Sequence, residues 1–281
     1  MLNFNGELTN SKATSFLAQN RGFQYGDGVF ETLRVLGGKI VFWEDHYFRL
    51  MASMRILRME IPMDFSPEFL EKEILKTIEA QENPQTNFRV KLVVCRKPGG
   101  YYLPQNLEID YLITLTELDH PFYLANNLDY KVELFKDHYI TSGLLSSLKS
   151  TNKIINILAS IYAQENDYQN CLLLNENKMV VEATNANLFW VKGNQIKTPP
   201  ISEGSLNGII RKKLIEIIKK LPTYTLKEEK ISPFNLQKAD ELFLTNSIQG
   251  IQSISGYRKK QFTHVVADEL RGKLNALARL S

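Results

Sequence analysis

Apolar residues recur along the chain with two periods, one typical of strands and one of helices. From Phe88 to Cys95 apolar residues alternate with Arg89 and Lys91, which predicts a half-buried strand. Short apolar runs predict further strands at 29–35, 39–42, 109–115, 130–135, 171–174, 178–181, 187–192, 195–198, 242–245 and 251–254. Apolar residues three to four positions apart predict helices at about 44–57, 66–80, 154–162, 207–221 and 264–280, and Ser232-Pro233 starts a short one.

Turn signals and one polar stretch suggest how these elements are organised. Asn5-Gly6 and Gly37-Gly38 predict tight hairpins. Because strands outnumber helices and mostly join through hairpins, the sequence favours two α+β domains over a parallel dinucleotide-binding sheet. The polar segment 117–127 predicts a linker between an N-terminal domain, residues 1–116, and a C-terminal domain, residues 128–281.

Composition narrows the class of protein. With 43% hydrophobic and 23% charged residues, the profile is that of a soluble globular protein. A net charge of +3 is too small to indicate a nucleic-acid or membrane partner. No apolar stretch approaches the roughly 20 residues of a membrane span, and no signal peptide is predicted. Cys95 and Cys171 lie in apolar runs, as reduced core residues of a cytoplasmic protein would.

Lys149 lies in a short turn that precedes a predicted helix, and Asn152 is expected to cap that helix. Such a turn fixes the backbone of the lysine and leaves its amine able to reach a ligand. A lone lysine is most often a solvated surface residue. The functional interpretation therefore depends on the other groups that the chain supplies.

Two further charged residues could bind an anionic cofactor. Arg49 has apolar neighbours on its predicted helix, so its guanidinium would need a buried anion, either a phosphate or a core carboxylate. Glu182 ends an apolar strand, where a carboxylate can face a cleft, although most strand-end glutamates are solvated.

Backbone and hydroxyl donors would complete a site for pyridoxal phosphate. Residues 208–210 open a helix whose first N–H groups favour phosphate, and residues 245–247 could add hydroxyl and amide donors. The amine of Lys149 would form a Schiff base with the cofactor aldehyde, and Arg49 would hold its phosphate. Glu182 would keep the pyridine nitrogen protonated, so that the ring can accept electrons.

Several segments then point to one family. They are 21–31 (RGFQYGDGVFE), 46–50, 148–152 (LKSTN), 181–189, 207–211 (NGIIR) and 244–249 (LTNSIQ). In this order the chain resembles the class IV aminotransferases, the fold-type IV pyridoxal-phosphate enzymes. That family includes branched-chain and D-amino-acid aminotransferases and 4-amino-4-deoxychorismate lyases.

The resemblance implies two α+β domains with the cofactor between them, and a small-molecule substrate, either an amino acid or aminodeoxychorismate. It also implies a homodimer in which a loop of one subunit closes the site of the other. It also implies roles by position. Lys149 matches the catalytic Schiff-base lysine, Glu182 the partner of the pyridine nitrogen and Arg49 the phosphate ligand. The other cofactor positions are Ile196 against the ring, the amides of Ile209 and Ile210, and Asn246 and Ser247 near the phosphate. The substrate positions are Tyr25, Phe30, Thr32, Arg34, Arg96 and Tyr101.

Differences within the family favour one reaction. Branched-chain enzymes usually have a small residue at Thr32, a tyrosine at Val94, a threonine at Ile210 and a tyrosine at Ile154. D-amino-acid enzymes have an Arg-x-His carboxylate trap where residues 101–103 read Tyr-Tyr-Leu. The segments around Lys149, 187–193 and 245–249 are more similar to the lyases, which release pyruvate and form 4-aminobenzoate for folate. An amino-acid transaminase with the same lysine chemistry is the alternative, and a binding module without cofactor on this fold is a third.

Overall fold

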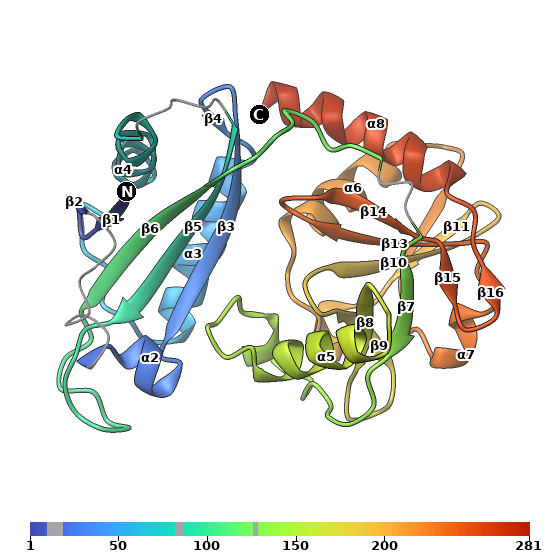
Figure 1. The fold of residues 1–281 in the computed structure, drawn as a ribbon, viewed down its shortest axis with the longest axis horizontal. Coiled ribbons are helices and arrows are strands. Elements are labelled where there is room, and N and C mark those ends of the chain that lie inside the picture. Colours follow the sequence, from blue (N-terminus) through green and yellow to red (C-terminus); the bar gives the residue numbers. More distant parts are fainter. Residues whose placement is uncertain (10–18, 82–86, 126–128) are drawn as a thin grey trace. The chain divides into compact units, whose positions relative to one another are not determined.

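The computed structural model describes residues 1–9, 19–81, 87–125 and 129–281. Contacts divide the chain into two units (Figure 1). Unit 1 comprises Met1–Pro121, Lys149–Asn152 and Ser281, and unit 2 comprises Phe122–Leu148 and Lys153–Leu280. The boundary after Pro121 falls within the predicted linker, whose residues 126 and 127 lie outside the described part. None of the helices in the described ranges is long and apolar enough to cross a membrane.

Unit 1 is built on a six-stranded sheet in which every strand pair is antiparallel. The strand order is β2-β1-β6-β5-β3-β4. The strands are β1 (Leu2–Phe4), β2 (Glu7–Thr9), β3 (Gly28–Leu36), β4 (Lys39–Ile40), β5 (Asn87–Arg96) and β6 (Ile109–Glu117). The helices are α2 (Arg21–Tyr25), α3 (Trp43–Ile56) and α4 (Pro67–Glu79).

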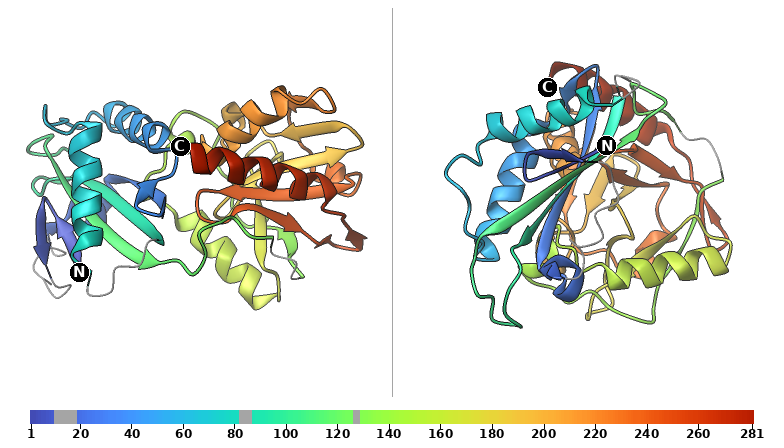
Figure 2. Two further views of the ribbon diagram at one scale, coloured as in Figure 1. Left: turned by 90° about the horizontal axis from the view of Figure 1, so that it is seen from above. Right: turned by 60° about the vertical axis from the view of Figure 1, so that its left-hand side comes forward.

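The alternation of β3 separates the two faces of this sheet. Val29, Leu33 and Val35 are buried in a core that also contains the apolar side of α3 and α4. Both helices lie on one side of the strands in the right-hand view of Figure 2. Because successive strand residues point to opposite faces, Phe30 and Thr32 are presented on the other side.

Unit 2 is built on a larger mixed sheet. Its order is β12-β11-β10-β9-β8-β7-β15-β16, while β13 pairs with β10 and β14. The strands are β7 (Lys131–Leu134), β8 (Asn170–Leu174), β9 (Val180–Ala183), β10 (Asn187–Lys192), β11 (Gln195–Thr198), β12 (Thr225–Glu228), β13 (Glu241–Asn246), β14 (Gly250–Ile254), β15 (Gly256–Tyr257) and β16 (Lys260–Gln261). The helices are α5 (Ile154–Glu165), α6 (Ile209–Lys219), α7 (Pro233–Leu236) and α8 (Val265–Leu280), with 3-10 turns η1 (Leu145–Ser147) and η2 (Ile201–Glu203).

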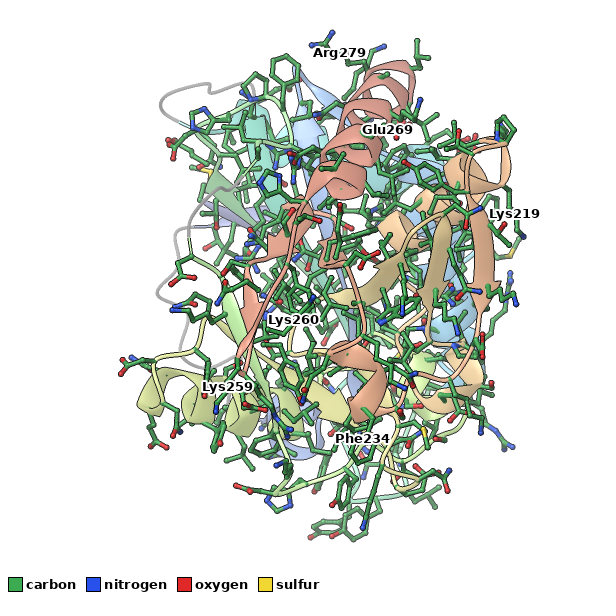
Figure 3. All side chains as sticks on the ribbon, turned by 90° about the vertical axis from the view of Figure 1, so that its right-hand side faces the viewer. Lys219, Phe234, Lys259, Lys260, Glu269 and Arg279 are labelled. Carbon is green, nitrogen blue, oxygen red and sulfur yellow. The ribbon has the colours of Figure 1, made fainter. Side chains whose placement is uncertain are left out.

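The two faces of this sheet have different neighbours. Alternate residues such as Leu188 and Leu242 form a core on one face. The opposite face packs against α5 beside β8, α6 beside β13, and α8 beside β13 and β14 (Figure 1). Glu241 fixes the start of α8, because its carboxylate accepts the backbone N–H groups of Val266 and Ala267 at 3.0 and 3.1 Å. Figure 3 shows Glu269 and Arg279 on the outer side of α8.

Most of the predicted strands and helices are present in the structure. Four observed elements were not predicted, and one predicted helix cap was wrong. The sequence reading missed α2, β12, β15 and β16, which are all four residues or fewer except α2 with five. Asn152 does not cap α5: the N-cap is Lys153, and the Asn152 side chain instead donates to the carbonyl of Gly26 at 3.1 Å. The prediction was wrong because the Asn152 side chain bonds to a residue far away in the sequence, which local sequence pattern cannot show.

Candidate active site

Lys149 is held by a short strand-like pairing with the start of β3. The N–H of Phe30 donates to the carbonyl of Lys149 at 2.9 Å, and the N–H of Thr151 donates to the carbonyl of Gly28 at 2.9 Å. Val29 and Ser150 form the bridge between these two bonds. These hydrogen bonds explain why Lys149–Asn152 groups with unit 1, although the sequence placed it in the C-terminal domain.

The Lys149 amine stands over an aromatic ring. Its Nζ lies 4.5 Å from the centroid of the Phe30 ring, a cation–π distance. Phe30 was predicted at a substrate position, so the structure brings this residue and the predicted catalytic lysine together.

Arg49 is held by a buried carboxylate in unit 1. Its Nε donates to Oε1 of Glu31 at 2.8 Å, and its Nη2 donates to Oε2 at 2.5 Å. His46 Nδ1 lies 2.7 Å from the same Oε2. The core-carboxylate alternative for Arg49 is therefore present. The phosphate role of Arg49 stays a prediction.

The pKa values of this cluster follow from burial and pairing. Burial alone would raise the pKa of Glu31, but the charge of Arg49 and the hydrogen bonds from His46 and Arg49 lower it to about 2. Burial lowers the pKa of His46, more than its bond to Glu31 raises it, and the charges of Arg49 and Lys149 lower it further. At neutral pH Glu31 is thus ionised, while His46 adds no second positive charge beside Lys149.

Three polar residues form a row across the sheet of unit 2. Glu182 on β9 is directly opposite Asn187 on β10, which is directly opposite Thr245 on β13. Opposed residues of antiparallel strands point to the same face, so these side chains are neighbours. Oε2 of Glu182 accepts the N–H of Leu206 at 2.9 Å and Nδ2 of Asn187 at 3.4 Å.

The start of α6 lies against this row. Gly208 is the N-cap and provides no side-chain hydrogen bond to the first turn. A Cβ on Gly208 would come within 1.9 Å of Oδ1 of Asn187, so only glycine allows this approach. Ile209 and Ile210 follow as the first helical residues, as predicted for amides that bind phosphate.

Thr245, which the sequence grouped with residues 246 and 247 as a possible donor, is a further candidate. It is 2% exposed, and its Oγ1 has no hydrogen-bond partner among the described residues. A buried hydroxyl without a partner costs about 1–3 kcal/mol, so this one fits a ligand. The only sequence signal was its place beside Asn246 and Ser247, since its register with Glu182 is set by strand pairing.

Other predicted cofactor residues are placed less favourably. The side chain of Asn246 closes the turn after β13: its Oδ1 accepts the N–H of Gln249 at 2.8 Å and its Nδ2 donates to Oε1 of the same residue at 2.9 Å. Ser247 lies in that turn, and its carbonyl accepts the hydroxyl of Tyr123 at 3.3 Å. Ile196 is fully buried and opposite Val191, four residues along β10 from Asn187, which is about 13 Å. This placement does not favour contact between Ile196 and a ring at the Glu182 row.

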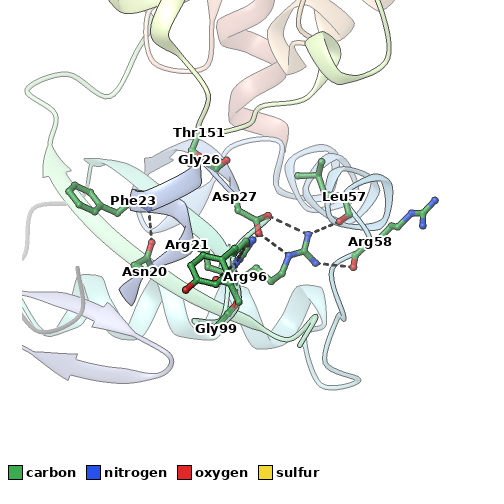
Figure 4. Close-up of polar contacts among 12 residues, drawn as sticks. Asn20, Arg21, Phe23, Gly26, Asp27, Leu57, Arg58, Arg96, Gly99 and Thr151 are labelled. Carbon is green, nitrogen blue, oxygen red and sulfur yellow. Dashed lines mark hydrogen bonds and ion pairs between the residues drawn. The ribbon is translucent and has the colours of Figure 1, made fainter. Parts of the chain in front are cut away.

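Arg96, a predicted substrate residue, has a structural environment instead (Figure 4). Its Nε donates to Asp27 at 3.0 Å, and Nη1 and Nη2 donate to the carbonyls of Arg58 and Leu57 at 3.1 and 2.8 Å, just after α3. Its side chain is 8% exposed. The prediction that Arg96 contacts substrate is not supported by these bonds, which anchor β5 to the end of α3.

Arg21, which sequence reasoning did not single out, holds the loop of residues 97–104. Its Nε donates to Asp27 at 2.9 Å, and its Nη1 donates to the carbonyls of Gly99 and Tyr101 at 3.0 and 2.6 Å. The loop presents Tyr101, which is 83% exposed. The centroid of the Tyr25 ring lies 4.9 Å from the Arg21 guanidinium, so this predicted substrate residue belongs to the same cluster.

The last two predicted substrate residues, Thr32 and Arg34, share a face of β3 with Phe30. Nη2 of Arg34 donates to the carbonyl of His120 at 2.5 Å, near the end of unit 1.

The family assignment follows from comparison with known proteins. A sequence profile described as "Amino-transferase class IV" matches residues 28–257, and the chain belongs to this family. Two curated relatives are an aminodeoxychorismate lyase of Vibrio harveyi, 27% identical over 84% of this chain and 85% of its own length, and a D-alanine aminotransferase of Listeria monocytogenes, 28% identical over 97% and 91%.

Solved structures agree on the fold. A putative 4-amino-4-deoxychorismate lyase from Legionella pneumophila superposes with a TM-score of 0.82 at 26% identity, covering 96% of this chain and 98% of that one. A branched-chain amino acid aminotransferase from Thermobaculum terrenum, in its holo-form with pyridoxal phosphate, gives 0.85 at 19% identity, covering 100% and 94%. The predicted fold-type IV architecture is thus confirmed, and the protein is a pyridoxal-phosphate-dependent enzyme of this family.

The residues present fit this cofactor. An amine, a guanidinium, a buried carboxylate and a helix N-terminus without a side-chain cap are the donors and acceptors that an anionic pyridine aldehyde requires. The unpartnered hydroxyl of Thr245, judged among the described residues, adds an independent sign of a ligand on the Glu182 row.

We predict that Glu31→Gln lowers the free energy of unfolding by about 3–5 kcal/mol at neutral pH, because Arg49 would keep a buried charge without its carboxylate. A carboxylate with a folded pKa of about 2 stabilises above its unfolded pKa, and this contribution is lost as the pH falls toward 2. The difference between variant and wild type should therefore shrink between pH 5 and pH 3 in urea titrations. Glu79→Gln, at an exposed glutamate of α4, is the control. A constant difference across this range would contradict an ionised Glu31.

Thr245→Val should weaken pyridoxal-phosphate binding about tenfold, the loss of one hydrogen bond to a charged ligand, without destabilising the cofactor-free protein. Thr198→Val is the matched control, because Oγ1 of Thr198 donates to the carbonyl of Leu188 at 2.8 Å. That control should lose stability by about 1 kcal/mol and keep its cofactor affinity. Spectroscopic titration and thermal unfolding separate the two effects. Equal cofactor affinity in Thr245→Val and wild type would remove Thr245 from the site.

Proposed function

We propose that the protein is a 4-amino-4-deoxychorismate lyase, which releases pyruvate and forms 4-aminobenzoate in folate synthesis in the cytoplasm. The similarity to the Vibrio harveyi lyase and to the Legionella pneumophila structure supports this reaction. Both cysteines are free and buried, which fits the proposed compartment.

The observation that most favours the lyase over a D-amino-acid transaminase is the chemistry of the loop 97–104, all of which is described. Lys97, its one basic residue, pairs with Glu108 at 2.6 Å. The neighbouring guanidiniums of Arg21 and Arg96 bind Asp27 and backbone carbonyls. The exposed side chains are Tyr101, Tyr102 and Leu103. A loop of this kind provides no cation for an amino-acid carboxylate.

In this proposal the residues of the chain divide the work. When bound, pyridoxal phosphate supplies an electron sink for the carbon that bears the substrate amine. The substrate amine displaces the Lys149 amine, which is then free to act as a general base and acid. Lys149 removes the proton from that carbon and returns a proton to the methylene of the departing group as the C–O bond breaks. Pyruvate and the aromatic ring form without net oxidation. Glu182 holds the pyridinium proton, and Arg49 with the start of α6 holds the phosphate.

An amino-acid transaminase is the second candidate, favoured by the D-alanine aminotransferase relative and by a 29% identical putative branched-chain aminotransferase of Methanocaldococcus jannaschii. In that case Lys149 would move a proton between the Cα of the amino acid and the C4′ carbon of the cofactor, and no C–O bond would break.

We expect purified protein with pyridoxal phosphate to release pyruvate and 4-aminobenzoate in equal amounts from 4-amino-4-deoxychorismate. It should transaminate a panel of L- and D-amino acids at least a hundredfold more slowly. Lys149→Ala should abolish both turnover and the visible absorbance of the lysine-bound cofactor. Rapid transamination without pyruvate release would show that the second candidate is right, whereas absorbance retained by Lys149→Ala would refute the lysine assignment.

We also propose that the enzyme is a homodimer. In addition to the exposed aromatic residues of the loop, the chain has an apolar stripe on α5 of Ile154, Ile157, Leu158 and Ile161, which are 64%, 52%, 36% and 45% exposed. Exposed apolar patches of this kind favour association with another protein surface. The family resemblance suggests a second copy, whose loop 97–104 would reach the site of its partner.

A mixed dimer of Lys149→Ala and Tyr101→Ala subunits tests this arrangement. If the loop acts in the partner's site, the intact Lys149 of the Tyr101→Ala subunit receives an intact loop from the other subunit. That dimer should then show the wild-type Michaelis constant at half the wild-type activity. The raised Michaelis constant of the Tyr101→Ala homodimer would indicate a loop that serves its own subunit. Light scattering of the wild type gives the oligomeric state directly.

A further inference from the structure

The face of the unit 1 sheet opposite α3 and α4 is basic. Its positions are fixed by the register of three strands, in which Thr32 is opposite Lys91 and Lys91 is opposite Thr114. Residues of this face are Phe30, Thr32 and Arg34 of β3, Arg89, Lys91 and Val93 of β5, and Leu112, Thr114 and Thr116 of β6. Three of these nine residues are basic and none is acidic. The same face continues to Asp110 of β6, whose Oδ1 accepts Nδ2 of Asn5 at 2.8 Å, and to Glu7 of β2. The part of the face around Lys91 therefore favours an anion.

Lys91 and Lys149 meet at the same aromatic ring. Nζ of Lys91 lies 5.2 Å from the centroid of Phe30, and Nζ of Lys149 lies 4.5 Å from it. The separation of the two ammonium groups therefore cannot exceed the sum of these two distances. A small molecule with an amine and a carboxylate on opposite ends of one ring can span such a gap.

Lys91 has no carboxylate partner among the residues that the structure describes, and it is exposed. The nearest acidic residue on β3, Glu31, points to the other face of the sheet and is bonded to Arg49 and His46. Arg49 also lies on that other face. The phosphate that Arg49 is predicted to bind would therefore be on the opposite side of the sheet from Lys91. The anion that suits Lys91 is a different one.

We propose that Lys91 binds a second carboxylate of the substrate, one remote from the reacting amine, and so selects amines that carry two anionic groups. Phe30 would hold the alkyl stem of Lys91 in place, while Lys149 acts at the other end of the same molecule. The proposal rests on the proposed function in one respect only, the position of the reacting amine at Lys149. A lyase acting on a ring with two carboxylates meets this requirement, and an enzyme for branched-chain amino acids does not.

The test compares the binding of isophthalate and benzoate, which have two and one carboxylates on the same ring and no amine, to the pyridoxal-phosphate-loaded enzyme by calorimetry. We expect wild type to bind isophthalate about tenfold more tightly than benzoate, the scale of one charge-assisted hydrogen bond. Lys91→Met should abolish this preference and leave cofactor affinity unchanged, and Lys91→Arg should restore it. Lys39→Met, at an exposed lysine of β4 in the same sheet, is the matched control and should keep the preference. The preference should also weaken in high salt.

Two results would overturn the proposal: a wild type that binds both ligands equally, or a Lys91→Met variant that keeps the wild-type preference. Neither depends on turnover, so they are separate from the assay for pyruvate. If pyruvate release fails but the Lys91-dependent preference is found, the lyase assignment is wrong while the second-carboxylate site stands, and the enzyme acts on an acidic amino acid.

Discussion

The buried carboxylate of Glu31 is the constraint on which the electrostatics of unit 1 depend. It lies on the helix-covered face of β3, where an isolated charge could not be accommodated, and it is stable there because Arg49 and His46 both bond to it. The same bonds orient the guanidinium and hold the His46 ring. Because burial keeps His46 neutral, the cluster adds one guanidinium near Lys149 and not two cations.

Unit 2 provides the complementary groups by a different device, the register of a sheet. Glu182, Asn187 and Thr245 come from three strands and are aligned only because the strands pair residue for residue. Gly208 then brings the start of α6 against Asn187. The predicted amine and guanidinium thus belong to unit 1, whereas the carboxylate, the helix amides and the Thr245 hydroxyl belong to unit 2.

Elements with strong periodicity could be predicted from the sequence. The partners of individual polar side chains could not, because they depend on how distant strands and loops pair. The alternation of 88–95 predicted β5, and Gly37-Gly38 predicted the β3–β4 hairpin, because local chemistry sets both. Asn152 was misjudged because its side chain bonds to the carbonyl of Gly26, a group whose position depends on the fold. The side chains of Arg96 and Asn246 likewise have partners that local pattern could not predict. The sequence grouped Thr245 with residues 246 and 247 as possible donors, but it could not show that the Thr245 hydroxyl lacks a partner among the described residues, because that is a property of packing. The identity of Lys149 and Glu182 came from the family motifs, not from periodicity.

The contrast between the loop 97–104 and the sheet suggests how specificity is set in this chain. Arg21 and Arg96 are both committed to Asp27, so the segment around the loop uses its guanidiniums to hold its own backbone. An anion must then be recognised elsewhere, and the basic face of β3 and β5 lies in unit 1 close to Lys149. A strand is a more rigid platform than a loop, and its register fixes the separation between Lys91 and Phe30. Selection by Lys91 would therefore depend on the length of the substrate as well as on its charge.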